Sequence, residues 1–324
     1  MQTVPSEQQL ASSSPCRLND PERSSEHSAV SLIIVNYNSG SFLLACVSSA
    51  VSQVDEVIVI DNASSDDSLA QLERLFPADQ RIRIFRNREN LGFATACNIG
   101  VEHSTGAFLC FLNPDCVLES DAVKHLLGVL YDHQDVGMVG GLLLNPDGTE
   151  QAGGRRAVPT PWRSFVRAFG LSCFADRWPR LFFDFHLHKE PRPVDPIEVE
   201  AISGACMLVR RTAMQSVGRW DEGYFLHCED LDFSMTLQRK GWKIMFVPGA
   251  KIIHDKGGCS RARPLFVEWH KHRGMMRFYR KFFHHQYPGP LMWVVALGIW
   301  LRFGVIASYV SAGLLRRRLQ AQRG

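Results

Sequence analysis

The sequence predicts an α/β fold with a mainly parallel sheet flanked by helices, on two observations. Short apolar runs rich in β-branched residues alternate with stretches of helical spacing between residues 31 and 112. Each apolar run ends in a polar turn composed of Asn, Asp, Ser or Gly. Strands that alternate with helices favour parallel pairing, and continuous apolar runs are typical of strands covered on both faces.

The first half of the chain supplies four predicted strands and two predicted helices. The strands are Ser31–Asn36, Glu56–Asp61, Arg81–Arg86 and Ala107–Leu112, and the helices are Phe42–Ser52 and Gly92–Glu102. Polar turn residues follow the first, second and fourth strands, which places the breaks between elements.

The pattern is weaker in the second half. A mixture of Pro, Trp, Phe and Arg over Ala157–Val199 predicts an irregular insertion that faces an acceptor or a membrane. Regular structure returns with a predicted strand over Glu200–Arg210, a helix over Cys228–Arg239 and a strand over Gly241–Val247, which a Pro-Gly turn follows.

The segment Leu291–Leu315 is almost wholly apolar and is long enough for one bilayer crossing of about 20 residues. Arg302 near its middle costs about 2.5 to 3.5 kcal/mol on insertion, and basic residues flank both ends, so one crossing cannot keep both ends on the positive side. We therefore predict a hairpin, re-entrant or interface-lying segment held by basic residues against anionic lipid, in preference to a true span or a buried core helix.

Composition divides the chain further. Residues 1–28 are mostly polar, lack the pattern of a signal peptide and are predicted to be a disordered leader. Nine cysteines without a C-x-x-C pair favour a reduced cytosolic compartment. The formal net charge is only +3, but the region after Lys251 holds many basic residues and only Asp255 and Glu268 as acids. That basic end is expected to seek anionic surfaces.

Three polar residues follow predicted strands and are the first candidates for chemistry. They are Asn38, Asp61 and Asp115. The ligand crevice of such a sheet lies outside the carboxyl ends of its strands, although each residue alone is explained equally well by a turn or a helix cap. Asp115 belongs to an Asn-Pro-Asp sequence and is predicted to bind Mg²⁺ or Mn²⁺, hard cations that take oxygen ligands and substrate phosphates.

A second acidic centre lies at residues 229–232. Glu229, Asp230 and Asp232 stand at the start of a predicted helix, where the helix dipole favours acidic residues whatever their role. The functional hypothesis makes Asp230 the base that accepts a proton from an acceptor hydroxyl. Further on, His254 precedes Lys256 and two glycines, a backbone that can approach a diphosphate closely.

Seven segments together resemble family 2 glycosyltransferases, particularly their rhamnosyltransferase-like branch. They are Ser31-Leu-Ile-Ile-Val-Asn-Tyr-Asn38, Val57-Ile-Val-Ile-Asp-Asn-Ala-Ser64, Asn90-Leu-Gly-Phe-Ala94, Asn98-Ile-Gly100, Phe111-Leu-Asn-Pro-Asp115, Gly204-Ala-Cys-Met-Leu208 and Glu229-Asp-Leu-Asp232. Their order along the chain from about Ser31 to Lys281 is more specific than any one of them.

The resemblance implies a GT-A fold with a Rossmann-like sheet, an inverting single displacement and a nucleotide-sugar donor. It implies donor contacts at Asn38, Asp61, Asn90 and Asn113, metal contacts at Asp115 and His254, a base at Asp230, and acceptor contacts at Gly204 and Glu229. It also implies a GT-A domain over residues 29–285, with a nucleotide-binding half (29–150) and an acceptor half (151–285), before a membrane-associating tail (286–324).

Two departures from the family pattern stand out. Thr236 occupies a position where relatives often carry Arg, which puts a phosphate or acceptor contact in doubt. Asn113-Pro114-Asp115 replaces the aspartate-any-aspartate metal motif, a replacement usual in this branch.

The function expected from these observations is transfer of a sugar, rhamnose from dTDP-rhamnose first and hexoses from uridine diphosphate next, to a glycan or lipid-linked acceptor in cell-surface polysaccharide synthesis. The enzyme is expected in the cytoplasm at the inner face of the membrane, with no nucleic-acid partner. The rival hypotheses are a nucleotidyltransferase, which would need a basic Gly-rich loop after the first strand, and an inactive membrane-bound scaffold. A dehydrogenase is disfavoured because no G-x-G-x-x-G follows that strand.

Overall fold

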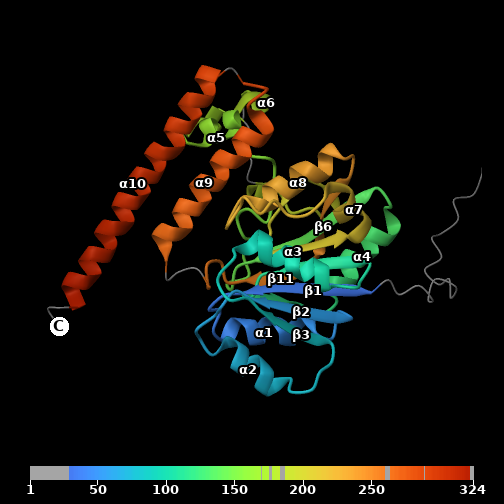
Figure 1. Cartoon of the computed structure of the whole chain (residues 1–324). Coiled ribbons are helices and arrows are strands. Elements are labelled where there is room, and N and C mark those ends of the chain that lie inside the picture. The colour runs from blue at the N-terminus through green and yellow to red at the C-terminus, as the bar shows by residue number, and fades with distance from the viewer. Residues whose placement is uncertain are drawn as a thin grey trace, which may run out of the picture.

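The computed structural model describes residues 29–168, 170–174, 177–182, 187–259, 263–287 and 289–321. The predicted leader, 1–28, lies outside the described residues. In Figure 1 a twisted sheet with helices around it forms the body of the molecule, and a pair of long C-terminal helices extends from one side.

The main sheet contains nine strands in the described chain and confirms the predicted fold class. Along the sheet the order is β3-β2-β1-β4-β10-β6-β11-β5, and β8 pairs with β11. The strands are β1 (Val30–Asn36), β2 (Glu56–Asp61), β3 (Ile82–Arg86), β4 (Phe108–Leu112), β5 (Cys116–Leu118), β6 (Val136–Leu144), β8 (Ile197–Glu198), β10 (Cys206–Arg210) and β11 (Lys243–His254). The strand pairings give β1, β2, β3, β4, β6 and β11 one common direction, so the sheet is mainly parallel.

The parallel strands bring the ends of β1, β2 and β4 to one edge. In the register of β1 and β2, Asn36 faces Asp61, and Ile33 of β1 faces Phe111 near the end of β4. The polar residues that follow these strands therefore share the carboxyl edge of the sheet, where α/β folds bind ligands.

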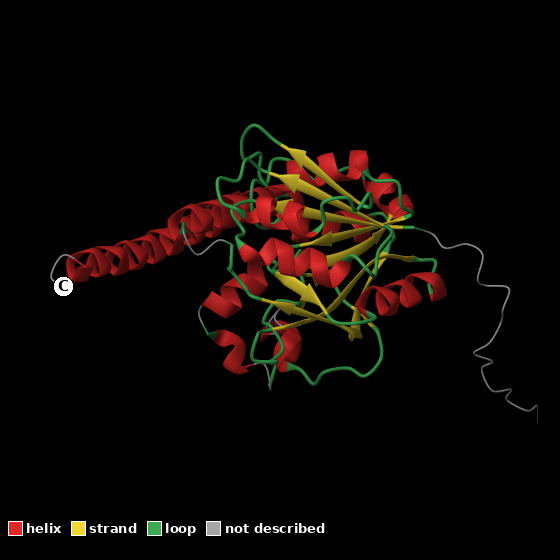
Figure 2. Ribbon diagram, turned by 90° about the horizontal axis from the view of Figure 1, so that it is seen from below, coloured by secondary structure: helices red, strands yellow, loops and turns green. Residues whose placement is uncertain are grey.

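Helices cover both faces of the sheet, as Figure 2 shows. They are α1 (Ser41–Ala50), α2 (Ser68–Leu75), α3 (Phe93–His103), α4 (Ala122–Asp132), α7 (Arg211–Val217) and α8 (Glu229–Arg239). Apolar side chains alternate between the two faces of each strand: Leu32 and Ile34 of β1 join one buried cluster with α1, and Ile33 and Val35 join another with α3. Burial on both faces explains why the strands are continuous apolar runs.

Two strand predictions in the second half need correction. The single strand predicted over Glu200–Arg210 is wrong, because β9 (Ala201–Ile202) pairs with β7 (Arg155–Arg156) in a separate two-stranded sheet and a turn at Gly204-Ala205 leads into β10. The strand predicted to end at Val247 continues to His254. A shift of register in its pairing with β6, between Val247 and Lys251, absorbs the Pro-Gly dipeptide.

The predicted insertion is partly helical. It contains α5 (Pro161–Ala168), η2 (Leu171–Phe174), α6 (Pro179–Phe182) and η3 (Leu187–Lys189). After β11 the chain forms α9 (Pro264–Phe283) and then α10 (Gly289–Ala321), which packs beside α9 (Figure 1).

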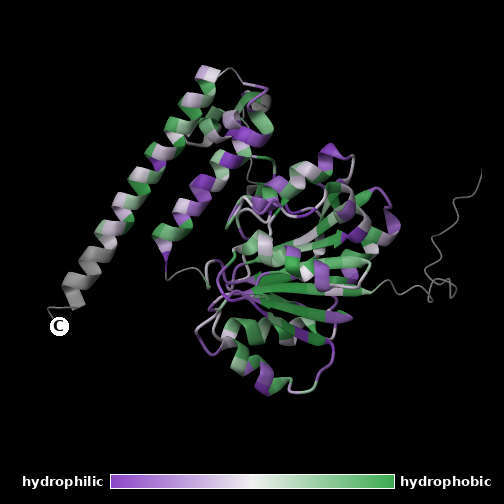
Figure 3. Cartoon of the chain, viewed as in Figure 1, coloured by the Kyte–Doolittle hydropathy of each residue, from purple (hydrophilic) through white to green (hydrophobic). Residues whose placement is uncertain are grey.

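The prediction of a hairpin within the apolar segment is wrong, because α10 is one uninterrupted helix. Residues 289–313 are long and apolar enough to cross a membrane, and none of the most apolar window is buried in the protein, so the helix is not a core helix. Figure 3 shows the contrast between the largely apolar α10 and the many polar residues of α9.

Most of the described cysteines are buried. All eight of them, Cys16 being outside the described residues, are free thiols, and six are buried. They therefore contribute to the core as small apolar groups.

Candidate active site

The loops after β1 and β2 are joined into one polar cluster. Asn36 donates from Nδ2 to Asp61 Oδ1 at 2.8 Å and to Ser64 Oγ at 3.1 Å. Ser64 in turn donates its backbone N–H to Asp61 Oδ2 at 3.1 Å and accepts the backbone N–H of Asn38 at 3.0 Å. The structure thus brings Asn38 and Asp61 together, and Asp61 is 3 % exposed.

The backbone of Asn38 has a conformation that few residue types adopt. Its φ of 50° lies in the left-handed region, which Asn adopts more readily than most residues. Its Oδ1 accepts the backbone N–H of Ser65 at 2.8 Å, which closes the loop after β1 against the loop after β2. The two loops therefore form one rigid rim at the sheet edge.

The turn at Asn90 adds a third part to this edge. Asn90 Oδ1 accepts the backbone N–H of Gly92 at 3.0 Å, and Asn62 Nδ2 donates to the Gly92 carbonyl at 3.1 Å. Gly92 has a φ of 85°, and a Cβ there would lie 2.7 Å from the carbonyl oxygen of Phe225. The Phe93 N–H donates to that same carbonyl at 2.8 Å. Only glycine fits this contact between the turn before α3 and the loop before α8.

Asp115 and His254 form a buried pair at the end of β4. His254 Nε2 lies 3.3 Å from Asp115 Oδ1, and the two residues are 7 % and 8 % exposed. Pairing of β5 with β11, with Cys116 opposite His254, brings them together. The other ring nitrogen of His254, Nδ1, lies 2.6 Å from Oε1 of buried Gln151, whose Nε2 donates to the His254 carbonyl at 3.0 Å.

The residues of this pair fit a divalent cation. Two ligand atoms that each lie about 2.1 Å from one ion are about 3 Å apart, close to the observed separation. The Cys116 thiol also lies within 4.8 Å of both ligand atoms. Histidines that bind a metal through one ring nitrogen are commonly oriented by a hydrogen bond to the other ring nitrogen, and Gln151 makes such a contact with Nδ1 of His254.

Asp230 is the second residue of α8, and both oxygens of its carboxylate have partners. Its Oδ2 accepts the backbone N–H of Gly204 at 3.1 Å and pairs closely with Arg156 Nη2. Its Oδ1 accepts the N–H of Leu231 at 2.8 Å. The carboxylate is 15 % exposed, so it is fixed in orientation and reachable. A Cβ on Gly204 would approach Asp230 Cβ to 3.2 Å, so a small residue suits this position.

Glu229 differs from Asp230 although the two are adjacent. Its side chain is buried, and its Oε2 has no hydrogen-bond partner within the described part of the chain. Burial, and next the charge of Asp230, raise the pKa of Glu229 to about 8. Glu229 therefore holds a proton at neutral pH.

Backbone contacts connect the loop of Asp115 to Asp230. The N–H of Asn113, two residues before Asp115, donates to the Ala205 carbonyl at 2.9 Å. Gly204, the neighbour of Ala205, holds Asp230. One short turn thus touches the loop of Asp115 and Asp230 itself, and it brings Asn113, Asp115, Gly204 and Asp230 into one site.

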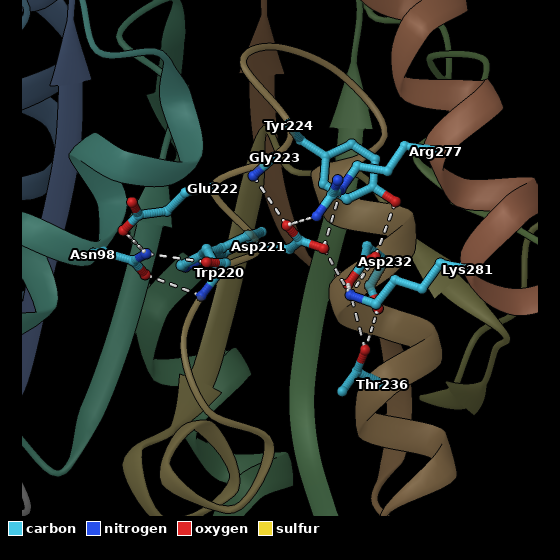
Figure 4. A network of polar contacts seen from close by, with 10 residues as sticks. All are labelled: Asn98, Trp220, Asp221, Glu222, Gly223, Tyr224, Asp232, Thr236, Arg277 and Lys281. Carbon is cyan, nitrogen blue, oxygen red and sulfur yellow. Dashed lines mark hydrogen bonds and ion pairs between the residues drawn. The ribbon is translucent and has the colours of Figure 1, made fainter.

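A network of charged groups attaches α9 to α8 and to the loop before it (Figure 4). Asp221 accepts from Arg277 at 2.7 Å and from Lys281 at 2.8 Å, and Lys281 also reaches Asp232 at 2.8 Å. The Tyr224 hydroxyl donates to Asp232 at 2.9 Å. Burial opposes ionisation of Asp221, but the bonds from Arg277 and Lys281 prevail and lower its pKa to about 2.

Close packing of α9 reinforces this attachment. His227 and Cys228, directly before α8, both have positive φ values, of 68° and 71°. A Cβ on Gly274 of α9 would lie 2.7 Å from the His227 carbonyl oxygen. The helix therefore lies against the strained pair that sets the start of α8. Thr236 donates its hydroxyl to the Asp232 carbonyl at 2.8 Å.

Sequence reasoning missed two residues of this site, Gln151 and Arg156. Arg156 Nε is buried and has no partner among the described residues, which marks it as more than a structural ion-pair partner. The signal for Arg156 was weak, since two arginines before a Pro-rich stretch are also typical of a surface loop. Gln151 carried no signal, because its role arises only from the pairing of β5 with β11.

Comparison with known proteins places this site in context. The sequence profile of Glycosyl transferase family 2 matches residues 31–218, and that of Glycosyl transferase family group 2 matches residues 153–316. A relative is the N-acetylglucosaminyl-diphospho-decaprenol L-rhamnosyltransferase of Mycobacterium tuberculosis, which is 26 % identical over 307 residues. The match covers 90 % of this chain and 97 % of that protein.

Solved structures agree in fold. The Pyrobaculum calidifontis mannosyltransferase PcManGT, in complex with GDP-Man and Mn²⁺, superposes with a TM-score of 0.54 at 14 % identity, over 90 % of this chain and 79 % of that one. GalNAc-T7 with UDP, GalNAc and Mn²⁺ gives a TM-score of 0.54 at 19 % identity, over 71 % of this chain and 44 % of the longer GalNAc-T7 chain. Because the family profile matches more than half of the chain and the fold agrees, the chain belongs to Glycosyl transferase family 2 and is a glycosyltransferase of the GT-A type.

Proposed function

We propose that this enzyme is an inverting glycosyltransferase that moves a sugar, with L-rhamnose from dTDP-rhamnose favoured, to a lipid-linked glycan acceptor. One observation carries the proposal: Asp230, oriented on one oxygen by Arg156 and Gly204, lies across a single turn from the loop of Asp115. A base and a diphosphate-binding group in one site are what direct displacement at a sugar carbon requires.

In the proposed mechanism Asp230 removes the proton of an acceptor hydroxyl. The Oδ2 atom of Asp230 accepts hydrogen bonds from Arg156 and Gly204. The Oδ1 atom accepts one from the Leu231 N–H and can accept one more. The acceptor oxygen forms a bond to the anomeric carbon from the face opposite the diphosphate, whose bond to that carbon breaks. The proton passes to Asp230, the nucleoside diphosphate leaves, and the configuration inverts.

Asp115 and His254 are proposed to hold Mg²⁺ or Mn²⁺. When bound, the cation offsets the negative charge that develops on the departing diphosphate. Gln151 fixes the ring of His254 through Nδ1, and the strand pairing of β5 with β11 fixes the distance between the two side chains. These residues preorganise the site, so little reordering is needed on binding.

The donor nucleotide is proposed to lie at the rim formed by Asn38, Asp61, Asn90 and Asn113. Asp61 is the last residue of β2, and Asn38, Asn90 and Asn113 follow β1, β3 and β4, so all four lie at the carboxyl edge of the sheet. The acceptor is proposed to approach from the other side, past Gly204 and Glu229. Glu229, protonated at neutral pH, has a hydroxyl to donate to an acceptor oxygen.

The choice of sugar and acceptor is supported by the mycobacterial relative, whose name specifies L-rhamnose transfer to a decaprenol-linked N-acetylglucosamine. That match extends over almost the whole of both chains. The apolar α10 and the basic end of the chain support an enzyme at the inner, cytoplasmic face of the membrane, acting in cell-surface polysaccharide synthesis.

The two rival hypotheses have less support. The nucleotidyltransferase hypothesis finds none in the family assignment, which is to glycosyltransferases. An inactive scaffold would not need an oriented base, and Asp230 keeps three hydrogen-bonded partners while remaining partly exposed.

The test is release of nucleoside diphosphate from a panel of nucleotide sugars, with Mn²⁺, Mg²⁺ or neither, in the presence of a lipid-linked acceptor. The proposal expects metal-dependent release, greatest from dTDP-rhamnose and lost in Asp115→Ala. Release from another donor alone would refute the choice of sugar. No release from any donor would favour the scaffold.

A further inference from the structure

We propose that α10 lies along the surface of an anionic bilayer without crossing it, and that exposed aromatic residues of the α5–α6 insertion contact the same bilayer. The inference extends the proposed use of a lipid-linked acceptor, and it rests on geometry that is independent of catalysis.

The first observation is that α9 accompanies the first half of α10. The ring of Trp269 lies 5.2 Å from that of Trp300 and 5.6 Å from that of Phe303, measured between ring centroids. His272 also contacts Phe303, with centroids 5.4 Å apart. Figure 1 shows the two helices side by side over this length.

This arrangement is incompatible with a full crossing by α10. Any bilayer that enclosed α10 from Gly289 to Phe303 would also enclose α9 beside it, where Glu268, Lys271 and Arg273 flank the contacting Trp269. Each such charge costs about 2.5 to 3.5 kcal/mol at the centre of a bilayer. Only the part of α10 beyond Phe303 is free of these ring contacts.

The free apolar part of α10 is too short to span. From Gly304 to Leu315, the residue before three consecutive arginines, it has 12 residues. At about 1.5 Å per residue this is about 18 Å, against a hydrocarbon thickness of about 30 Å. A helix in the plane of the interface leaves the basic residues at both of its ends among the headgroups of one leaflet.

The second observation is a group of mutually contacting aromatic side chains in the insertion. The "aromatic cluster" is Trp162, Phe165, Phe174, Trp178 and Phe182. Four of the five are between 42 and 48 % exposed, and Leu181 beside them is 55 % exposed. Aromatic residues in such a patch are typical of a bilayer interface, where the rings sit at the level of the headgroups.

The aromatic cluster is attached to the same helices as α10. Ser164 of α5 and buried Tyr279 of α9 share a hydrogen bond of 2.6 Å. Tyr279 belongs to an apolar core against which Met292, Val295 and Ile299 of α10 pack. Figure 1 shows α5 and α6 beside the amino-terminal end of α10.

A bilayer is favoured over a second copy of the chain as the occupant of this surface. The exposed apolar side chains of α10 occupy about half of the helix circumference at 100° per residue, and they include Trp293, Val294, Leu297, Leu301, Val305 and Tyr309. A second protein would cover one stripe of such a helix, whereas lipid adapts to its whole free circumference. The basic flanks supply the complementary charge for anionic lipid.

The position of this surface suits a lipid-linked substrate. Arg156, which pairs with Asp230, is five residues before Pro161 at the start of α5. Five residues reach at most about 18 Å, so the aromatic cluster begins within that distance of the base. An acceptor sugar joined through a diphosphate to a lipid in the bilayer would then present its hydroxyl near Asp230.

Flotation of the full-length enzyme with phosphatidylcholine vesicles, with and without phosphatidylglycerol, tests the proposal. No donor is added, so the result does not depend on the proposed function. The variant Leu181→Glu puts a charge on the proposed lipid-facing surface, and Leu75→Glu puts one on α2 at an equally exposed leucine, 57 % against 55 %. Both positions are exposed, so both variants should fold, as thermal melting will show.

The proposal expects the wild type to float better with phosphatidylglycerol. Leu181→Glu should weaken apparent vesicle affinity about tenfold, and Leu75→Glu should leave it within about twofold. Equal binding by Leu181→Glu and the wild type would overturn the role of the aromatic cluster. Failure to float with either vesicle, together with a dimer in solution that Leu181→Glu dissociates, would make the surface a protein interface and overturn the proposal.

Labelling of a cysteine added after Gly324 tests whether α10 crosses. A membrane-impermeant maleimide should label it only after cell lysis, with the chain lacking the added cysteine as the background. Labelling in intact cells would show a crossing helix and contradict the in-plane arrangement.

Discussion

Lys281 offers a sharp test of how α9 is attached to α8 and to the loop before it. Its ammonium group lies 2.8 Å from both Asp221 and Asp232, on two different segments. The change Lys281→Met keeps the alkyl chain and removes the charge. Asp221 retains Arg277 as a partner, but Asp232 retains only neutral donors, of which Tyr224 is the nearest.

The expected loss follows from the unequal burial of the two partners. The side chain of Asp232 is 6 % exposed and that of Lys281 is 39 % exposed. Breaking a fully buried pair costs about 3 to 5 kcal/mol, and breaking an exposed pair costs at most about 1 kcal/mol. With one partner buried and the other partly solvated, we expect Lys281→Met to lower the free energy of unfolding by about 2 kcal/mol.

The loss should depend on pH in a direction that the structure fixes. Burial raises the pKa of Asp232 above its usual range, and the bond from Lys281 opposes that rise. Without Lys281 the pKa rises further, so the folded variant takes up a proton at a higher pH than the wild type. The folded state then binds more protons than the unfolded state, and the deficit of the variant should shrink as the pH falls from about 7 to about 5.

Urea unfolding at both pH values measures this, in a double-mutant cycle with Asp232→Asn. Lys240→Met, a change at an exposed lysine at the end of α8, is the matched control and should alter stability by less than about 0.5 kcal/mol. The reasoning predicts a coupling of about 1 to 2 kcal/mol between Lys281 and Asp232. Additive effects, with coupling below about 0.3 kcal/mol, would refute it.

Three further predictions concern single residues of the site. Gln151→Leu removes the group that orients His254 and should weaken Mn²⁺ binding 10- to 100-fold by calorimetry without donor; unchanged affinity would separate Gln151 from the metal site. Gly92→Ala should lower the free energy of unfolding in urea by at least about 2 kcal/mol, because the added Cβ would meet a backbone carbonyl. Gly148 has a similar positive φ but open space around it, so Gly148→Ala should lower that free energy by only about 1 kcal/mol. Equal losses in the two variants would refute the contact at Gly92. Since the pKa of Glu229 is raised to about 8, the free energy of unfolding of the wild type should decrease as the pH rises from about 5 to about 8. Glu229→Gln should abolish the part of this decrease that Glu229 causes. A variant with the same pH dependence as the wild type would contradict this prediction.

The first half of the fold was predictable because its signals are local. β1, β2 and β4 are buried on both faces and end in polar turns, and β3 alternates apolar with charged residues, so the positions and parallel order of these four strands follow from the sequence pattern. The second half depends on distant contacts. The separation of β9 from β10 requires a partner at Arg155–Arg156, and the continuation of β11 past a Pro-Gly dipeptide requires β5 and β6 on either side.

The candidate site divides in the same way. Asp61, Asp115 and Asp230 could be proposed from their places after strands or at a helix start, together with the family resemblance. Arg156 and Gln151 could not, because a side chain becomes part of a site through tertiary contacts that no local pattern records. The apolar α10 was recognisable from composition, but its continuity as one helix beside α9 was not.

Single-turnover kinetics of Asp230→Asn tests the proposed role of Asp230 as the base of the transfer. The change preserves size, and calorimetry of donor binding shows whether the rest of the site is intact. The account predicts donor affinity within about threefold of the wild type and a transfer rate lowered by about 10² to 10⁴, the range usual for loss of a general base. Wild-type transfer by Asp230→Asn, with donor binding unchanged, would contradict the account.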